Sequence, residues 1–394
     1  MDACLSVDPS PETMPSSRAC FATANQAPID LPEQVLIMIV SRVRDVRPAA
    51  AEADANSLCA DVMHGIGSVS RLWRCLAKGV LMGDELAWLR VPGAAVAAEC
   101  MSAFPRALSL RIVGDARAGD IGAVLGSRSV TRLAIESNRM MRGCDGLGQL
   151  VGLRALYIEE CGRLRDAAAL SSLVDLRTLQ VTSCKLRAAS LASSLAPMTQ
   201  LTSLHLRSIS IGVAGAASLE PSLALMTQLT SLYLQCNSIG AVGAASLAPS
   251  LALMARLTSL NLWGNAIGEA GAAALAPSLA SMAQLTSLIL AMNAIGDAGA
   301  ASLAPSLAAM VQLTSLNLWG NTIGPAGAAA LAPSLASIAQ LTSLDLSHNS
   351  LGDVGAAALA PSLAMMAQLT WLSLGGNDIG DAGAALLPRQ TCYW

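Results

Sequence analysis

The sequence is poor in aromatic and charged residues, and it has no cluster of metal-binding side chains. Only two Phe and three Tyr occur among 394 residues, and 13% of the residues are charged, so Ala and Leu must fill the core. The ten Cys include no Cys-x-x-Cys pair, and His64, His205 and His348 lie far apart. These spacings argue against a zinc site and a disulfide framework, and they indicate a reducing compartment. No cofactor is expected.

A secretory signal and a basic stripe are also absent. Residues 1–28 lack the basic start and apolar centre of a signal peptide, and we expect a disordered, Ser- and Pro-rich leader there. From residue 201 onward the sequence has three basic residues, Arg207, Arg256 and Arg389, and seven acidic ones. Residues 1–200 contain 21 basic and 20 acidic residues. Nucleic acid and anionic membranes are therefore not expected as partners.

The charge-free stretch of residues 270–296 does not have the composition of a membrane span. A spanning helix needs about 20 continuous apolar residues, and Pro277, Gln284 and Asn293 are among the residues that interrupt this one. The stretch also recurs with a period of 28 residues, which is typical of a solenoid. The motif "LTSL", with "LTWL" in its last copy, begins at Leu201, Leu229, Leu257, Leu285, Leu313, Leu341 and Leu369.

Each unit reads L-x-x-L-x-L-x-x-N-x-I-G followed by an Ala-rich segment. The alternation predicts a short strand with Leu257, Leu260 and Leu262 in the core, and the Ala-rich run predicts a helix. A recurring Pro such as Pro277 predicts short or kinked helices. The Asn of each turn is expected to be buried, and its side-chain amide should form hydrogen bonds with backbone groups that the turn leaves unpaired. Successive amides would form a ladder, in which a Cys thiol replaces the amide at two positions. The predicted ladder residues are Cys161, Cys184, Asn237, Asn265, Asn293, Asn321, Asn349 and Asn377.

Weaker units precede the regular ones and start at Leu176, Leu153, Val130 and Ala107, which gives eleven units in all. The pattern resembles the leucine-rich repeat of the ribonuclease-inhibitor type. That resemblance implies an α/β horseshoe with parallel strands on its concave side and helices on its convex side. Residues 96–200 are interpreted as irregular repeats and residues 201–394 as regular 28-residue repeats.

A different pattern lies between the leader and the repeats. "IDLPEQVLIMIVSRV" places apolar residues at helical spacing behind a Pro in the first turn, and "VSRLWRCLAKGVLMGDELAWLRV" follows. Residues 29–95 resemble an F-box, the helical module that binds the Skp1 adaptor of cullin-type ubiquitin ligases. The alternative is a plain helical cap that covers the end of the solenoid. The resemblance implies adaptor contacts or module packing at Leu31, Pro32, Val35, Leu36, Ile39, Val40, Val43 and Trp73, with Val69 and Trp88 in the later helices.

An F-box followed by repeats containing "GAAALA" is similar to the GALA-type effectors of plant-pathogenic bacteria. That resemblance implies a type III effector and virulence factor, secreted into the host cytoplasm, that recruits a target to a Skp1-containing ubiquitin ligase as its substrate receptor. The alternative is a cytoplasmic scaffold or inhibitor without a ubiquitin link. An enzyme is not expected, because the repeats leave no room for a catalytic domain and Cys392 has no neighbouring His or acid.

Target binding is expected on the concave face, where one motif position from successive strands forms a column. Exposed Trp and Tyr dominate many interfaces, and Trp263 and Trp319 would lie roughly 10 Å apart, two strand spacings. The alternative is that recent duplication copied one Trp, since the two repeats are nearly identical. The candidate target-binding residues are His205, Arg207, Tyr233, Trp263, Ile289, Trp319, Asp345 and Trp371.

Overall fold

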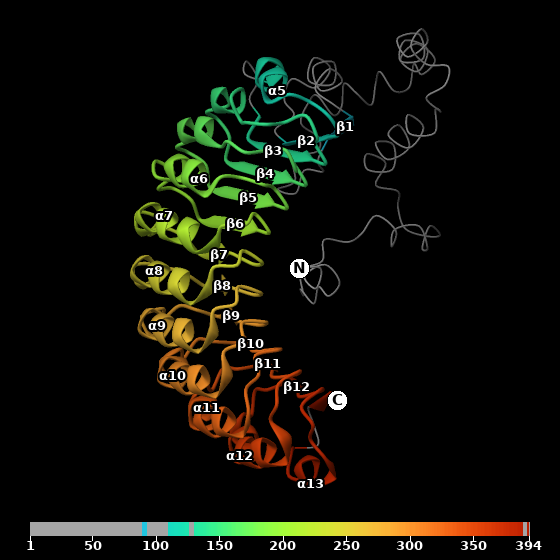
Figure 1. The fold of residues 1–394 in the computed structure, drawn as a ribbon, viewed down its shortest axis with the longest axis vertical. Helices are drawn as coiled ribbons and strands as arrows, with labels where there is room; N and C mark the ends of the chain where they lie inside the picture. Colours follow the sequence, from blue (N-terminus) through green and yellow to red (C-terminus); the bar gives the residue numbers. More distant parts are fainter. Residues whose placement is uncertain (1–88, 93–108, 126–129, 389–391, 394) are drawn as a thin grey trace, which may run out of the picture.

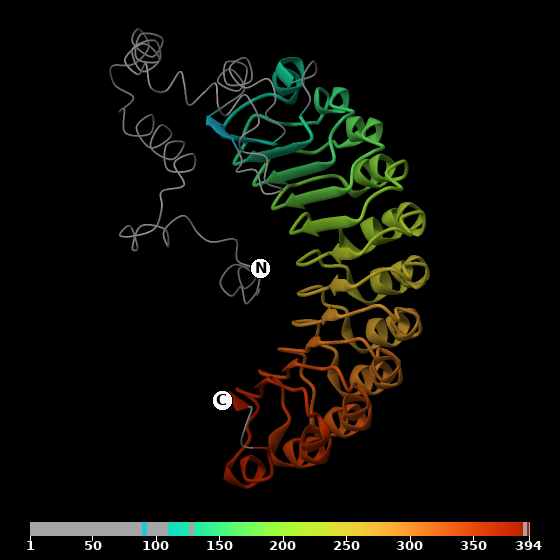
Figure 2. The ribbon, with the colours of Figure 1, turned by 180° about the vertical axis from the view of Figure 1, so that it is seen from behind.

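The structure, a computed structural model, describes residues 89–92, 109–125, 130–388 and 392–393. In this part of the chain thirteen parallel strands form one sheet in chain order, along the inner side of an arc whose outer side carries the helices (Figures 1 and 2). The predicted α/β horseshoe is thus confirmed for the described repeats. The strands are β1 (Leu89–Pro92), β2 (Ser109–Val113), β3 (Arg132–Glu136), β4 (Ala155–Glu159), β5 (Thr178–Thr182), β6 (Ser203–Arg207), β7 (Ser231–Tyr233), β8 (Ser259–Asn261), β9 (Ser287–Ile289), β10 (Ser315–Asn317), β11 (Ser343–Asp345), β12 (Trp371–Ser373) and β13 (Cys392–Tyr393).

The convex side carries one helical element in each repeat. Of the 23-residue repeats, the first contains the eight-residue α5 and the next two contain only the 3-10 helices η3 and η4, whereas α7 to α12 in the 28-residue repeats have 13 or 14 residues. These elements are α5 (Ala118–Leu125), η3 (Leu147–Gln149), η4 (Ala168–Ser172), α6 (Ala188–Leu195), α7 (Gly212–Ala224), α8 (Gly240–Ala252), α9 (Gly268–Ala280), α10 (Gly296–Ala309), α11 (Pro325–Ser337), α12 (Gly352–Met365) and α13 (Asp381–Ala384).

The strands follow from the Leu alternation. Leu257, Leu260 and Leu262 are all at most 2% exposed, while Ser259 and Asn261 between them are half-buried on the other face. Strands β2 to β6 have five residues, but β7 to β12 have three. In the regular repeats the backbone therefore leaves the strand pattern earlier, directly before the turn that contains the ladder Asn.

Two glycines of each G-x-x-G motif have different roles, illustrated by α9. Gly268 has φ +67°, a conformation that costs an L-residue roughly 1–2 kcal/mol, and it begins the helix. Gly271 faces the preceding helix, and a Cβ there would lie 3.0 Å from Cα of Ala241 and 2.6 Å from Cγ2 of Ile267. Small residues thus let neighbouring helices approach closely, as the Ala-rich composition predicted.

The recurring Pro does not shorten the helices, so the prediction of short helices was wrong. In α9 the helix continues through Pro277, which is exposed. The missing N–H deprives the carbonyl of Ala273, four residues earlier, of a helical partner. Ala273 is exposed, so water can pair with that carbonyl, and the cost of the Pro is reduced.

The Thr of each "LTSL" motif adds a second ladder, which the sequence reasoning missed. The Thr258 hydroxyl donates to the carbonyl oxygen of Thr230 at 3.0 Å, and the backbone N–H groups of Thr258 and Ser259 donate to the same oxygen. The pattern repeats from Thr202 to Thr370. Each strand start is thereby tied to the strand before it.

The predicted leader and nearly all of the predicted F-box-like module lie outside the described residues. Within the module's predicted range, Leu89–Pro92 form β1 and pair with β2, so the solenoid sheet begins inside the range assigned to a helical module. The repeats also extend further than the eleven predicted units, because β13 adds a strand beside β12. None of the described helices has both the length and the apolar character needed to span a bilayer.

Candidate partner-binding surface

Strand register aligns the concave side chains in columns. We call one the central column; it contains the middle residue of each strand from β2 to β6 and, in register with these, the last residue of each strand from β7 to β12. The central column is Arg111, Ala134, Tyr157, Gln180, His205, Tyr233, Asn261, Ile289, Asn317, Asp345 and Ser373. We call the column two residues further along each repeat the distal column; backbone hydrogen bonds continue its register beyond the short strands. The distal column is Val113, Glu136, Glu159, Thr182, Arg207, Gln235, Trp263, Ala291, Trp319, Ser347 and Gly375.

An aromatic stack occupies the middle of the central column. The rings of His205 and Tyr233 stack with centroids 4.1 Å apart and an interplanar angle of 21°. Ser259 donates to the Tyr233 hydroxyl at 3.0 Å, and the Ser203 hydroxyl lies 3.0 Å from Nε2 of His205. Burial lowers the pKa of His205 to about 4, because desolvation disfavours the charged imidazolium. This part of the surface is therefore neutral at pH 7.

Two indoles continue the aromatic surface in the distal column. Trp263 and Trp319 are half-buried, and their backbone N–H groups donate to the side chains of Asn261 at 3.0 Å and Asn317 at 2.9 Å. Ala291, only 2% exposed, lies between them in the column. The Trp319 ring also meets the ring of His348 edge-on at 5.7 Å. Asn261 and Asn317 of the central column thus hold the backbone at the two Trp residues in place.

The other predicted target-binding residues differ in accessibility. Ile289 and Arg207 are half-buried, in β9 and at the end of β6. Trp371 is 38% exposed and aligns with Ser343, so it belongs to the column of serines that precedes the central column. The prediction that Asp345 contacts the target needs correction, because this residue is only 7% exposed. Its carboxylate already accepts hydrogen bonds from Ser347 and from Asn317, the latter at 3.3 Å. We therefore assign Asp345 to the support of this surface.

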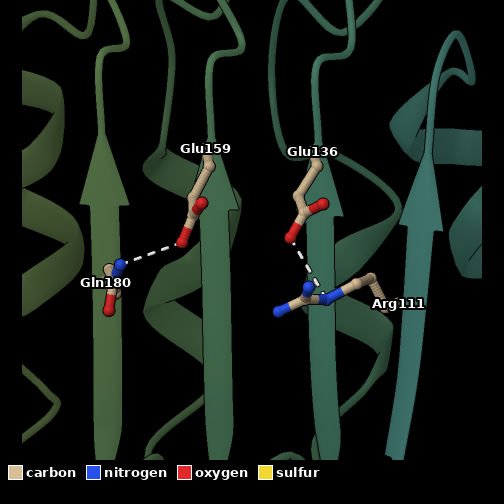
Figure 3. Close-up of polar contacts among 4 residues, drawn as sticks. All are labelled: Arg111, Glu136, Glu159 and Gln180. Atoms are coloured by element: carbon tan, nitrogen blue, oxygen red, sulfur yellow. Dashed lines mark hydrogen bonds and ion pairs between the residues drawn. The ribbon is translucent and has the colours of Figure 1, made fainter. Parts of the chain in front are cut away.

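Polar residues cover the concave face of the irregular repeats, and the sequence reasoning missed them (Figure 3). Arg111 pairs with Glu136 at 3.1 Å, and Gln180 donates to Glu159 at 2.9 Å. Glu136 and Glu159 are direct neighbours in register. Burial, then the charge of Glu136, raises the pKa of Glu159, while Arg111 opposes the shift. The same Leu alternation was available in these repeats to identify the solvent-facing positions.

Buried amides support this surface from beneath. The Asn265 amide N–H donates to the carbonyl oxygens of Leu234 and Leu262 at 2.9 Å and of Trp263 at 3.3 Å. Its side-chain oxygen accepts the backbone N–H of Asn237 at 3.0 Å. These contacts hold the backbone carbonyl next to the Trp263 side chain. Equivalent side-chain amide contacts occur at Asn237, Asn293, Asn321, Asn349 and Asn377.

The irregular repeats use a different set of residues at the ladder position. The thiols of Cys161 and Cys184 are buried and donate to the carbonyl oxygens of Glu159 at 3.5 Å and Thr182 at 3.3 Å. Asn138 is fully buried and donates to the carbonyl oxygen of Ala116 at 2.7 Å, although the sequence reasoning did not select it. The spacing of "LAIESN" after Val130 contained the signal. Ile209 fills the same position between the Cys and Asn parts of the ladder.

The predicted adaptor-binding set from Leu31 to Val43, together with Trp73, lies outside the described residues. The adaptor-binding role of these residues therefore stays a prediction from the sequence.

Comparisons with known proteins identify the repeat class. A family model described as Leucine Rich repeat matches residues 226–248, 256–276, 283–304, 312–332, 340–360 and 369–387. These six stretches are leucine-rich repeats, and each coincides with one of the regular 28-residue units. No curated protein sequence matches the chain.

Two solved structures are similar to the chain. One is an internalin from Listeria monocytogenes, with 24% identity, a TM-score of 0.42 and coverage of 69% of this chain and 82% of the internalin. The other is the plant peptide hormone receptor RGFR1 in complex with RGF2, with 17% identity and a TM-score of 0.39. That match covers 75% of this chain and 55% of the receptor chain.

Proposed function

We propose that the chain is a receptor that binds a protein partner on its concave face, through the His205–Tyr233 stack and the two indoles Trp263 and Trp319. Leucine-rich repeats are a protein-interaction scaffold, which supports this class of function. The observation that carries the proposal is the group of aromatic side chains that four of the five repeats from β6 to β10 place on the concave face. Aromatic side chains with a polar edge supply large contact area at a low entropic cost, and they are enriched among residues that dominate binding energy.

The surface favours a neutral or apolar partner segment over a highly charged one. His205 is uncharged at pH 7 because burial lowers its pKa, and Ile289 lies further along the same column. The Arg111, Glu136 and Glu159 cluster lies toward the other end of the sheet, where it provides polar contacts of both signs. A partner that spans both parts would therefore meet an aromatic centre and a polar flank.

The double variant Trp263→Ala, Trp319→Ala tests the proposal. Quantitative affinity capture with the full chain should recover a set of proteins that the double variant loses, with a fall in direct binding of at least tenfold, or about 1.4 kcal/mol. Val242→Ala, on the exposed surface of α8, is the matched control for loss of an apolar side chain. Equal capture by the double variant and the wild type would contradict the concave site.

We further propose that the N-terminal segment recruits a Skp1-type adaptor, so that the receptor presents its partner to a ubiquitin ligase as a bacterial effector in a host cell. This proposal is supported by the F-box-like sequence of residues 29–95 and the GALA-like repeats. The alternative is a plain scaffold or inhibitor. In both versions the chain acts by binding, without a catalytic step.

The adaptor proposal has its own test. Leu31→Ala with Pro32→Ala should abolish Skp1 binding in a pull-down while the circular dichroism spectrum and the melting temperature stay unchanged. A lower melting temperature with no adaptor binding by either protein would support the plain cap. Loss of Skp1 binding in this variant, with concave binding intact, would separate the two proposals.

A further inference from the structure

A hollow of about 400 Å³ lined by three arginines lies on a part of the surface that the proposed function does not use. Arg142 follows β3, and Arg163 and Arg165 follow β4, in the loops that lead from the sheet to η3 and η4. The hollow is open to solvent and its described lining residues are exposed, so a ligand there would be held by charge more than by burial. The feature therefore combines a defined space with three permanent positive charges.

The backbone brings these charges together. The N–H of Arg165 donates to the carbonyl oxygen of Arg142 at 2.9 Å, and the N–H of Arg187 donates to that of Arg165 at 3.0 Å. Three successive loops thus place an Arg at the same position. Like charges in register repel one another unless opposite charges lie between them, so this arrangement favours occupancy by an anion.

Among the described residues no carboxylate forms an ion pair with Arg142, Arg163 or Arg165. Neither Arg142 nor Arg163 has a side-chain hydrogen bond or ion pair in the described part of the chain. Asp145 and Asp166 lie close by, next to Gly143. Oδ1 of Asp166 accepts hydrogen bonds from Ser190 and from the N–H of Ala168, which hold this carboxylate in place beside the loop.

Arg165 is held in position for binding. Its Nη1 donates to the carbonyl oxygens of Lys185 at 3.1 Å, Gly162 at 3.4 Å and Leu164 at 3.5 Å. The remaining guanidinium N–H groups stay available at the hollow. Such fixation lowers the entropy lost on ligand binding, because the fork of donors is already oriented.

We propose that Arg142, Arg163 and Arg165 form a binding site for a small ligand that carries phosphate groups. A guanidinium fork matches two phosphate oxygens, and bonds between charged partners are stronger than neutral ones. Three forks in one small hollow favour a ligand with more than one phosphate group. The phosphates belong either to a soluble molecule or to a lipid headgroup, which share this chemistry. The site is separate from the concave columns, so its ligand and the protein partner can bind at the same time.

Calorimetric titration of the full chain with tripolyphosphate at low ionic strength tests the site. The wild type should bind saturably, and binding should weaken as salt is added. Vesicles of phosphatidylcholine with phosphatidylinositol bisphosphate form a second arm of the experiment. Binding of free tripolyphosphate supports a soluble ligand, and binding of the vesicles alone supports a lipid headgroup. Failure of both probes to bind at concentrations up to about 10 mM would overturn the proposal.

Substitutions assign binding to the hollow. Arg142→Gln with Arg163→Gln should reduce affinity at least tenfold, because two charge-assisted contacts are lost. Both side chains are exposed, and an unchanged circular dichroism spectrum would show that the variant is folded. Arg256→Gln, an exposed Arg in the regular repeats, removes one charge elsewhere and should leave the affinity within about twofold of the wild type. An equal loss in Arg256→Gln would contradict a local site, as would full affinity in the double variant.

Discussion

At the scale of single residues, the turn after each strand has the most demanding backbone. The residue before the ladder position adopts positive φ throughout, as at Cys236 (53°), Met292 (55°) and His348 (52°), and glycines occupy it in the repeats of Trp263, Trp319 and Trp371, namely Gly264, Gly320 and Gly376. The ladder amide stabilises this turn, because it supplies donors and an acceptor where the backbone has none. One side chain therefore determines whether several buried polar groups are paired.

Asn293→Ala should lower the free energy of unfolding by at least about 1–3 kcal/mol. The substitution removes the acceptor for the N–H of Asn265 at 2.9 Å and the donor to the carbonyl oxygens of Leu262 and Leu290, both at 2.9 Å. Urea unfolding followed by circular dichroism measures the change, with exposed Gln284→Ala as the control. A variant as stable as the wild type would mean that water replaces the amide.

His205 makes the stability of the folded chain depend on pH. Its pKa is about 4 in the folded state because of burial, against an ordinary value of 6.5. Between these values the unfolded chain binds a proton that the folded chain does not. The contribution of neutral His205 is therefore complete above pH 6.5 and is lost as the pH falls toward 4. The raised pKa of Glu159 acts in the opposite direction, since its contribution is lost as the pH rises.

His205→Phe should retain the stack on Tyr233 without the titration. Its melting temperature should fall less than that of the wild type when the pH is lowered from about 7 to about 4.5. Scanning calorimetry of both proteins gives this difference, and NMR titration of the wild type should find no protonation of His205 above pH 5 or so. Identical pH profiles would show that the imidazole is solvated.

At the scale of elements, neighbouring repeats support one another at the helix starts. Asp297, in α10, accepts the N–H groups of Gly324 and Gly327 at 2.7 Å each and so caps α11. Gly324 precedes Pro325 and has φ −97°, unlike the positive-φ glycines at the start of α7 to α10. A Pro disfavours several conformations of the residue before it, and the Asp supplies the acceptor that this altered start requires. Asp353 makes the same contacts with Gly380 and Gly383.

Asp297→Ala should destabilise the chain by about 0.5–2 kcal/mol, the usual cost of losing a helix cap. Glu269→Ala is the matched control, because Glu269 has the same position in the preceding repeat and its side chain makes no hydrogen bond among the described residues. Urea unfolding of the two variants should therefore separate them. Equal effects would indicate general charge at the helix start instead of specific capping.

At the scale of the whole molecule, the sheet and the helices are continuous from repeat to repeat. Buried Leu residues of successive layers belong to one extended hydrophobic cluster. Stability in such an array is the sum of repeat and interface contributions. The curvature follows from the difference between strands about 4.8 Å apart and helices that pack at about 8–10 Å.

Leu288→Ala, in β9, should lower the free energy of unfolding by about 2–5 kcal/mol. Leu288 is fully buried between equivalent Leu residues of β8 and β10, and close packing on both sides prevents the cavity from collapsing. Urea unfolding measures the loss, and Val242→Ala, 66% exposed on α8, should change stability by no more than about 0.5 kcal/mol. A small effect at Leu288 would imply that neighbouring repeats relax into the space.

The sequence by itself determined the repeat architecture, because the 28-residue period places every buried Leu and Asn in register. It also indicated the aromatic positions Tyr233, Trp263 and Trp319. Only the tertiary structure decided that Asp345 is paired, that the imidazole of His205 stacks on Tyr233, and that Arg142 and Arg165 meet on adjacent loops. Periodicity fixes which side of the sheet a residue faces, since that depends on local geometry. The hydrogen-bond partners, the burial and the neighbouring charges of a side chain depend on how the loops of adjacent repeats pack against each other. Because these loops differ in length, the period alone does not determine which side chains come into contact.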